Sequence, residues 1–185
     1  LVKNTLTLSV YSLLVTFPIP IILALVLNEL SPKLKKFTQT VLYAPHFLST
    51  VVLVGMMLVM FSKSSGVINT ILEALGFERY YFFGEPEAFS RLYVWSSVWQ
   101  NMGWSTIIYV AALSGVSTEL HEAAKIDGAS RWRRVLSVDL PAIMPTISIM
   151  LIMRFGSIMS VGYEKVYLMQ KSTNIDVSEV ISTYV

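Results

Sequence analysis

The chain has 185 residues, of which 54% are apolar and 14% are charged. Soluble domains carry roughly a quarter charged residues, so this composition indicates a membrane protein. The chain contains no cysteine, which excludes disulfides, thiolate metal sites and a cysteine nucleophile. The net charge of +2 is too small to indicate nucleic-acid binding, and no nucleic-acid partner is expected.

Four apolar stretches are long enough to cross a bilayer, whose hydrocarbon core needs about 20 helical residues. They cover residues 5–28, 37–61, 92–116 and 142–163. The sequence therefore predicts an all-α, polytopic membrane helix bundle that forms one transmembrane domain over residues 1–185. Because the chain starts without a methionine, we read it as part of a longer protein.

The first two predicted spans contain helix-perturbing residues. Pro18 and Pro20 lie inside the first span, where a membrane bundle tolerates a bend if neighbours satisfy the freed carbonyls. They mark either a bent span or a hinge of a gate. The second span carries His46 after Pro45, and this histidine suits either an interfacial position or a functional role.

The stretch 62–91 separates the second and third predicted spans. Residues 67–77 have the apolar spacing of a short amphipathic helix that ends at Gly76. Four aromatic residues follow at positions 80–83, and such residues are typical of the bilayer interface.

The third span carries polar and aromatic side chains at membrane depth, where polar groups should face protein or water rather than lipid. Aromatic rings can stack on sugars, but they also serve in ordinary packing. Arg154 interrupts the fourth span and needs a cavity, a partner or a route to the interface. The candidate residues for a polar pathway through the membrane are Trp99, Gln100, Asn101, Trp104, Tyr109 and Arg154.

Residues 117–141 form the only long polar segment with internal order. Ser117 can cap a helix, and Glu119 lies in its first turn, where a negative charge suits the helix dipole. Gly128 provides a stop, and a second short helix can begin after Ser130. Pro141 then opens the fourth span at a position where a missing N–H costs little.

The distribution of basic residues predicts which loops are cytoplasmic. Lys and Arg are concentrated in loops 29–36 and 117–141, whereas those of loop 62–91 are offset by four glutamates. The positive-inside bias therefore places the first two loops in the cytoplasm and the third outside.

The sequence lacks the motifs of the enzyme classes that it superficially suggests. His121-Glu122 could begin a zinc-protease motif, but position 125 holds a lysine instead of the second histidine. No glycine-rich loop is followed by Lys-Ser or Lys-Thr, so the chain has no phosphate cradle of its own. We therefore expect no catalytic residues, metal or cofactor in this chain, and any ATP use must come from a partner.

Glu122-Ala123-Ala124, Gly128 and Leu140-Pro141 resemble the EAA signature of permease subunits in binding-protein-dependent ABC importers of the MetI-like superfamily. The usual isoleucine two positions before the Leu-Pro pair is Val138 here, a mild departure. The strings EAAKIDGASRW, YAPHFLS and GWSTIIYVAAL resemble the LplB-type sugar permeases, relatives of the maltose-type subunits. The likeness covers nearly the whole chain.

This resemblance implies a multi-pass subunit of a bacterial plasma or inner membrane. It implies six spans in all, one of them before Leu1 and one after Val185. It also implies an ABC ATPase subunit, a second identical or homologous permease subunit, an extracellular solute-binding protein and a carbohydrate substrate, in addition to membrane lipid.

The resemblance further assigns roles within residues 117–141. In the family the short helix sits in a groove of the ATPase, and its glutamate pairs with a basic residue there. Carried over, Glu122 forms the ion pair, and Gly128 makes the turn that Asp127 caps or braces. The expected ATPase-coupling residues are Leu120, Glu122, Ala123, Ala124, Asp127, Gly128, Ala129, Leu140 and Pro141.

Other interpretations remain open at this point. Residues 117–141 could lie on the lipid surface with their arginines near anionic head groups. The chain could also be a permease for another solute class, an ATP-independent secondary transporter or channel, or a membrane scaffold that does not transport. A secondary transporter should carry coupling-ion ligands in broken helices, and no acidic residue lies inside any predicted span.

Overall fold

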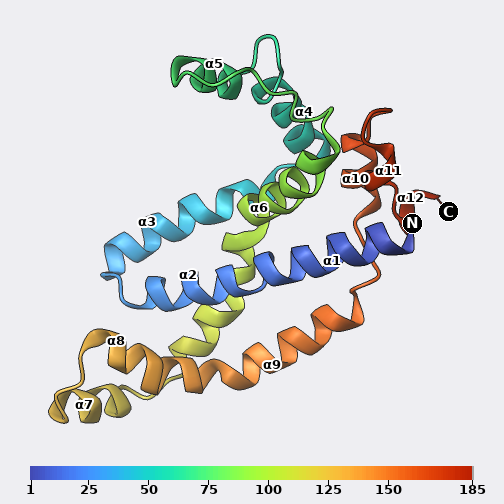
Figure 1. The fold of residues 1–185 in the computed structure, drawn as a ribbon. Coiled ribbons are helices and arrows are strands. Elements are labelled where there is room, and N and C mark those ends of the chain that lie inside the picture. Colours follow the sequence, from blue (N-terminus) through green and yellow to red (C-terminus); the bar gives the residue numbers. More distant parts are fainter. Residues whose placement is uncertain (185) are drawn as a thin grey trace. The chain divides into compact units, whose positions relative to one another are not determined.

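A computed structural model describes residues 1–184, and every regular element in that range is helical. Figure 1 labels most of the elements along the chain. They are α1 (Val2–Thr16), α2 (Pro18–Asn28), α3 (Pro32–Tyr43), the 3-10 helix η1 (Ala44–Phe47), α4 (Thr50–Met60), α5 (Val67–Ala74), α6 (Pro86–Ser114), α7 (Thr118–Ile126), α8 (Arg131–Arg134), the π-helical turn η2 (Val135–Asp139), α9 (Leu140–Gly156), α10 (Tyr163–Met169), α11 (Ile175–Ser178) and α12 (Ile181–Tyr184).

The number of membrane spans is not confirmed. Within residues 1–184, the segments Val2–Asn28 and Arg131–Gly156 are long and apolar enough to cross a membrane by themselves. The pair Pro32–Phe47 and Thr50–Met60 qualifies only as a unit that bends by 96°. Helix α6 is long enough at 29 residues, but serine, threonine and amide side chains dilute its apolar character.

The prolines explain the breaks near the N-terminus. Pro18 and Pro20 lie in the first turn of α2, where a missing N–H leaves no hydrogen bond unmade. Helices α1 and α2 still form one continuous candidate span. Helix α3 ends at Tyr43, two residues before Pro45, and the 3-10 helix η1 follows it. Helix α4 then begins at a cap, because Ser49 Oγ accepts a hydrogen bond of 3.3 Å from Val52 N.

The chain divides into two compact units. The first comprises Leu1–Leu13, Phe47–Ser97 and Ile158–Val185, of which residue 185 is not described. Its core contains fully buried residues from α4, α6 and α10 such as Val54, Val94 and Val166. The start of α1 is tied to the C-terminal segment, because Asn4 Nδ2 donates to the carbonyls of Asp176 at 2.7 Å and Glu179 at 3.1 Å.

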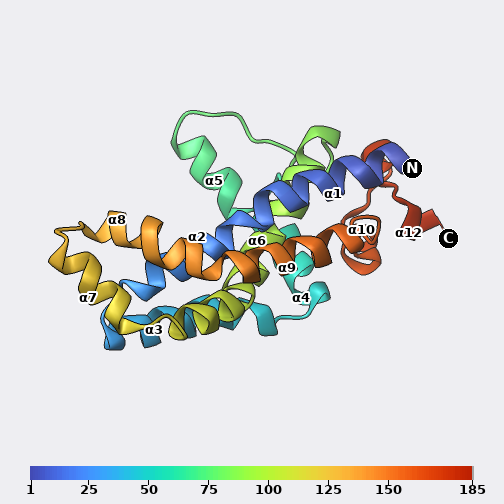
Figure 2. The ribbon, with the colours of Figure 1, turned by 90° about the horizontal axis from the view of Figure 1, so that it is seen from below.

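The second unit comprises Leu14–His46 and Val98–Ser157. Ala24 of α2, Tyr109 and Leu113 of α6, and Ile143 of α9 form its apolar core. Helix α3 approaches α6 so closely that a Cβ at Gly103 would lie 2.1 Å from the carbonyl oxygen of Leu42. Figures 1 and 2 both show α7 and α8 as a hairpin at the end of this unit where α9 begins.

A buried lysine marks the first unit. Lys165 on α10 is 7% exposed, and its Nζ donates to the carbonyl of Tyr93 at 3.1 Å and to Ser97 Oγ at 2.6 Å. The ammonium also lies 5.0 Å from the centre of the Tyr93 ring. Burial lowers the pKa of Lys165 from 10.5 to about 7, because removal from water disfavours the charged form.

This lysine predicts a pH dependence of stability. Between pH 7 and pH 10.5 the unfolded chain binds a proton at Lys165 that the folded chain has released, so the free energy of unfolding rises with pH there. Lys165→Met should remove a contribution of up to about 1.4 kcal/mol per pH unit. The measurement is thermal unfolding of the detergent-solubilised complex across this window, with exposed Lys3→Met as the control. An unchanged slope in Lys165→Met would contradict the assignment.

Candidate functional site: the hairpin of residues 117–141

Helix α7 begins with a side-chain cap. Ser117 Oγ accepts a hydrogen bond of 3.2 Å from the backbone N–H of Glu119, which satisfies one of the free donors of the first turn. Glu119 adds a negative charge at this end, where the helix dipole favours it. The predicted start of the helix is confirmed.

The turn between α7 and α8 depends on Gly128. The residue has a φ of +74°, a conformation that glycine adopts without steric cost. The N–H of Ala129 donates to the carbonyl of Ala124 at 2.9 Å, and that of Gly128 to Lys125 at 3.0 Å. This pair of hydrogen bonds is the Schellman arrangement that closes a helix. Asp127 occupies the C-cap position.

Helices α8 and α9 form one continuous helix through the π-helical turn η2. Ser130 Oγ accepts from Arg133 N at 3.4 Å and starts α8, as the sequence predicts. Pro141 has no N–H and cannot donate the regular helical hydrogen bond to the residue four positions earlier. The π-helical turn η2 lies just before this proline. The second arm of the polar hairpin and the fourth apolar stretch are therefore joined without a loop.

The hairpin exposes an apolar and charged surface. Within α7 no residue is buried, and Ile126 is 87% exposed. On the second arm Trp132 is 74% exposed. The signature residues Glu122 and Ala123 are also exposed. Large apolar side chains at such exposure indicate a surface that another molecule covers.

A buried carboxylate lies at the base of the hairpin. The Asp139 side chain is 1% exposed, and its Oδ1 lies 3.3 Å from His121 Nε2 of α7. Asn28 Nδ2, at the end of α2, donates to the same oxygen at 3.5 Å. The charges of Glu29 and Arg134 also act on this carboxylate. One side chain thus connects the hairpin, η2 and α2.

Sequence reasoning missed this cluster. In the sequence, His121 was considered only as part of an incomplete zinc-protease motif, and Asp139 lies 18 positions later in the chain. The available signal was an acidic residue placed one turn before a membrane span, where an unpaired charge is costly. Asn28 could not have been linked to it without the packing of α2.

The predicted pathway residues fall into different environments. His46 Nδ1 lies 3.0 Å from Asn101 Oδ1, and the His46 ring stacks on Trp104 with centroids 4.4 Å apart. Tyr109 is 3% exposed and lies in the apolar core of the second unit. Among the others, Gln100 is buried, whereas Trp99 and Arg154 are exposed. Their assignment to a translocation pathway remains a prediction, as does the coupling role of the hairpin residues.

Metal binding has no support in residues 1–184, where no group of three or more His, Cys, Asp or Glu side chains could hold an ion.

Residues 8–161 match a family model described as "Binding-protein-dependent transport system inner membrane component". The chain belongs to this family. The inner-membrane location in this description agrees with the expectation from the EAA signature.

Curated relatives of this permease family match over the full chain. The polygalacturonan/rhamnogalacturonan transport system permease protein YteP of Bacillus subtilis (strain 168) is 44% identical over 186 residues, covering 100% of this chain and 58% of the relative. Protein LplB of the same organism is 43% identical with the same coverage. The chain therefore spans a little over half the length of these two permeases.

The fold also matches a solved permease. A bacterial ABC transporter involved in the import of the acidic polysaccharide alginate superposes with a TM-score of 0.96 and 43% identity, over 99% of this chain and 64% of that one. The same values describe the alginate transporter in complex with an alginate pentasaccharide-bound periplasmic protein. The expected all-helical permease fold is confirmed, and so is the resemblance to LplB-type permeases.

The buried carboxylate yields a prediction about the order of the hairpin. Asp139→Ala removes the acceptor shared by His121 and Asn28, so α7 should open more often and its amides should exchange about fivefold faster, equivalent to losing roughly 1 kcal/mol. Hydrogen exchange of the α7 peptide in the assembled transporter measures this, with exposed Ser148→Ala on α9 as the control. Equal exchange in both variants would show that the tie does not hold the hairpin.

Proposed function

We propose that the chain is part of the permease subunit of an ATP-driven ABC importer for oligosaccharides. The exposed hairpin carries this proposal, because it presents the EAA residues on α7, and a turn at Gly128 joins α7 to the continuous helix of α8, η2 and α9. The sugar class rests on the relatives, whose names refer to polygalacturonan, arabinooligosaccharides, diacetylchitobiose and alginate.

The hairpin couples the membrane helices to a separate ATPase. Ala123 on the exposed surface of α7 permits close approach of a partner helix, and Glu122 offers a carboxylate for a basic residue of that partner. Ile126 supplies an apolar anchor of the kind that dominates protein interfaces. When ATP draws two such ATPases together, the hairpin moves with them and carries α9 along.

This role requires the hairpin to face the cytoplasm. Loop 117–141 is rich in Lys and Arg, and the positive-inside bias places it there. Loop 62–91 then lies outside, where a solute-binding protein delivers the sugar. The complete assembly comprises two permease subunits, two ATPases and this binding protein. Its membrane helices alternate between inward-open and outward-open states, and both partners bias that equilibrium.

The sugar pathway is expected along the second unit's part of α6. Trp99 and Trp104 expose ring surfaces that suit stacking on sugars. The polar pair of His46 and Asn101 lies beside Trp104, because the His46 ring stacks on it. Arg154 on α9 is exposed and faces the cavity between the two permease subunits.

An ATP-independent transporter or channel is the competing function. In such a protein no ATPase would cover the exposed apolar residues of α7, and these residues would contact lipid head groups instead. Dependence of uptake on ATP and on the ATPase separates the two functions.

Reversal of one charge tests the coupling. Glu122→Lys should abolish ATP-dependent sugar uptake into vesicles, because it places a positive charge against the basic residue expected in the ATPase groove, where like charges cost several kcal/mol. Glu119→Lys, on the same exposed helix, is the matched control and should retain uptake. Co-purification of all subunits shows that both variants assemble. Uptake that persists without the ATPase would refute the proposed function.

A further inference from the structure

The first unit contains a basic pocket with a volume of about 580 Å³. Three cationic side chains line it, and no acidic residue does. Aromatic and hydroxyl side chains also line it. The lining includes Lys63, Arg79, Lys171, Ser62, Tyr81 and Phe83.

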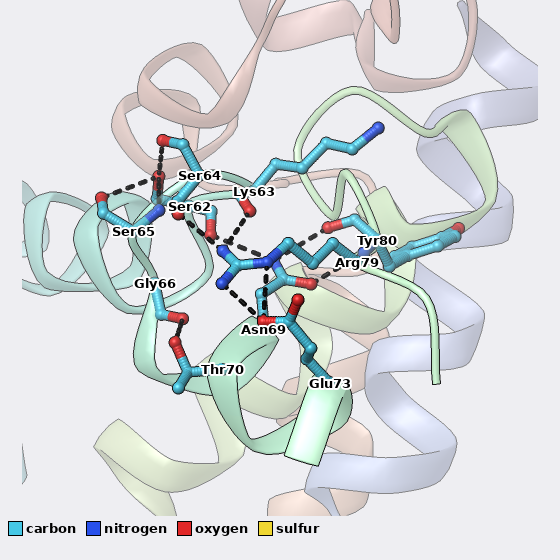
Figure 3. A network of polar contacts seen from close by, with 10 residues as sticks. All are labelled: Ser62, Lys63, Ser64, Ser65, Gly66, Asn69, Thr70, Glu73, Arg79 and Tyr80. Carbon is cyan, nitrogen blue, oxygen red and sulfur yellow. Dashed lines mark hydrogen bonds and ion pairs between the residues drawn. The ribbon is translucent and has the colours of Figure 1, made fainter. Parts of the chain in front are cut away.

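Arg79 holds one wall of this basic pocket. Its Nη1 donates to the backbone carbonyls of Lys63 at 3.0 Å and Ser64 at 2.6 Å. Its Nε and Nη2 donate to Glu73 Oε2 at 3.1 Å and 2.7 Å. Arg79 is therefore largely neutralised and structural. Figure 3 shows the Lys63 side chain extending away from this network, with its ammonium clear of the residues drawn.

Buried Asn69 fixes the same wall from behind. Its Nδ2 donates to the carbonyls of Ser62 and Tyr80, each at 3.0 Å, and its Oδ1 accepts from Tyr80 N at 2.7 Å. The turn after α4 and the extended segment that leads to Tyr81 are thus held together (Figure 3).

A second buried amide fixes the segment that carries Lys171. Asn174 Nδ2 donates to the carbonyl of Phe83 at 3.0 Å, and Asn174 Oδ1 accepts from Lys171 N at 3.0 Å. Asn174 is 1% exposed. The backbone that carries Lys171 is therefore tied to the segment that carries the aromatic lining.

These hydrogen bonds hold the walls of the pocket in place before any ligand binds. Asn69, Arg79 and Asn174 join three chain segments through backbone carbonyls, so little ordering remains to be done on binding. The ammonium groups of Lys63 and Lys171 have no ion-pair partner in the part of the chain that is described. Two lining lysines without an ion-pair partner favour a ligand with more than one negative charge.

We propose that this basic pocket binds the carboxylates of an acidic oligosaccharide, with Lys63 and Lys171 as the charged contacts. Tyr81 offers a ring face for a sugar, and Ser62 offers a hydroxyl for its polar groups. This inference rests on the proposed function and narrows its substrate to uronate-containing sugars. The names of two relatives at 43–44% identity refer to polygalacturonan/rhamnogalacturonan and to the acidic polysaccharide alginate, and the pocket adds the residues that would bind such a sugar.

The pocket lies in loop 62–91 and the segment after α10, and the proposed topology puts loop 62–91 outside. It therefore meets the sugar before the membrane helices do. The other candidate occupant is an acidic surface of the solute-binding protein, and the experiment below separates the two.

The test is calorimetric binding of a galacturonate trisaccharide to the complete transporter in nanodiscs, without nucleotide or binding protein. The double variant Lys63→Gln/Lys171→Gln should bind about tenfold more weakly, because two charge-assisted contacts are lost. The matched control Lys3→Gln/Arg91→Gln removes two exposed charges from the same unit and should bind like the wild type. A neutral galactose trisaccharide should not distinguish the variants.

Absence of wild-type binding, or equal affinity in both double variants, would overturn the proposal. So would a result in which only the affinity for the binding protein falls, equally with acidic and neutral sugar. ATP-dependent uptake measured in parallel tests the proposed function separately. Sugar binding that depends on Lys63 and Lys171, without ATP-driven uptake, would refute the proposed function and still support the proposed sugar site.

Discussion

The contact between His121 of α7 and Asp139 of η2 is the constraint on which the functional account depends. A short helix with no buried residue has little packing to hold it in place, and isolated helices of nine residues are unstable in water. The Asp139 carboxylate supplies the missing attachment by contacting His121 and the end of α2. The hairpin therefore remains exposed while one of its residues is held by a contact with the helix that precedes α9.

Much of this hairpin is predictable from local sequence. Ser117, Gly128 and Ser130 act through hydrogen bonds to residues at most a few positions away, so their roles as caps and turn can be predicted from spacing. The all-helical fold is equally evident from long apolar stretches. The bend of 96° between α3 and α4 was not predicted, because an apolar run does not record where a helix breaks and restarts.

The interactions that join distant segments could not be predicted from one sequence. Asn28 and Asp139 lie 111 positions apart, and Asn174 reaches Phe83 across 91 positions. Each is a polar residue that looks unremarkable in its own neighbourhood and becomes important only when packing buries it. Buried amides and carboxylates are costly without partners, so they identify the places where the fold is most strongly specified. In this chain they lie behind the hairpin and behind the basic pocket.

The central claim is that an ATPase covers the exposed face of α7 in the cytoplasm. The chain has no cysteine, so Ile126→Cys introduces a single thiol at a residue that is 87% exposed. The decisive measurement is labelling of this thiol by a membrane-impermeant maleimide in inside-out vesicles, with and without the ATPase subunit. The account predicts rapid labelling without the ATPase and strong protection with it. Labelling only from the opposite face of the membrane, or unchanged labelling when the ATPase is bound, would contradict it.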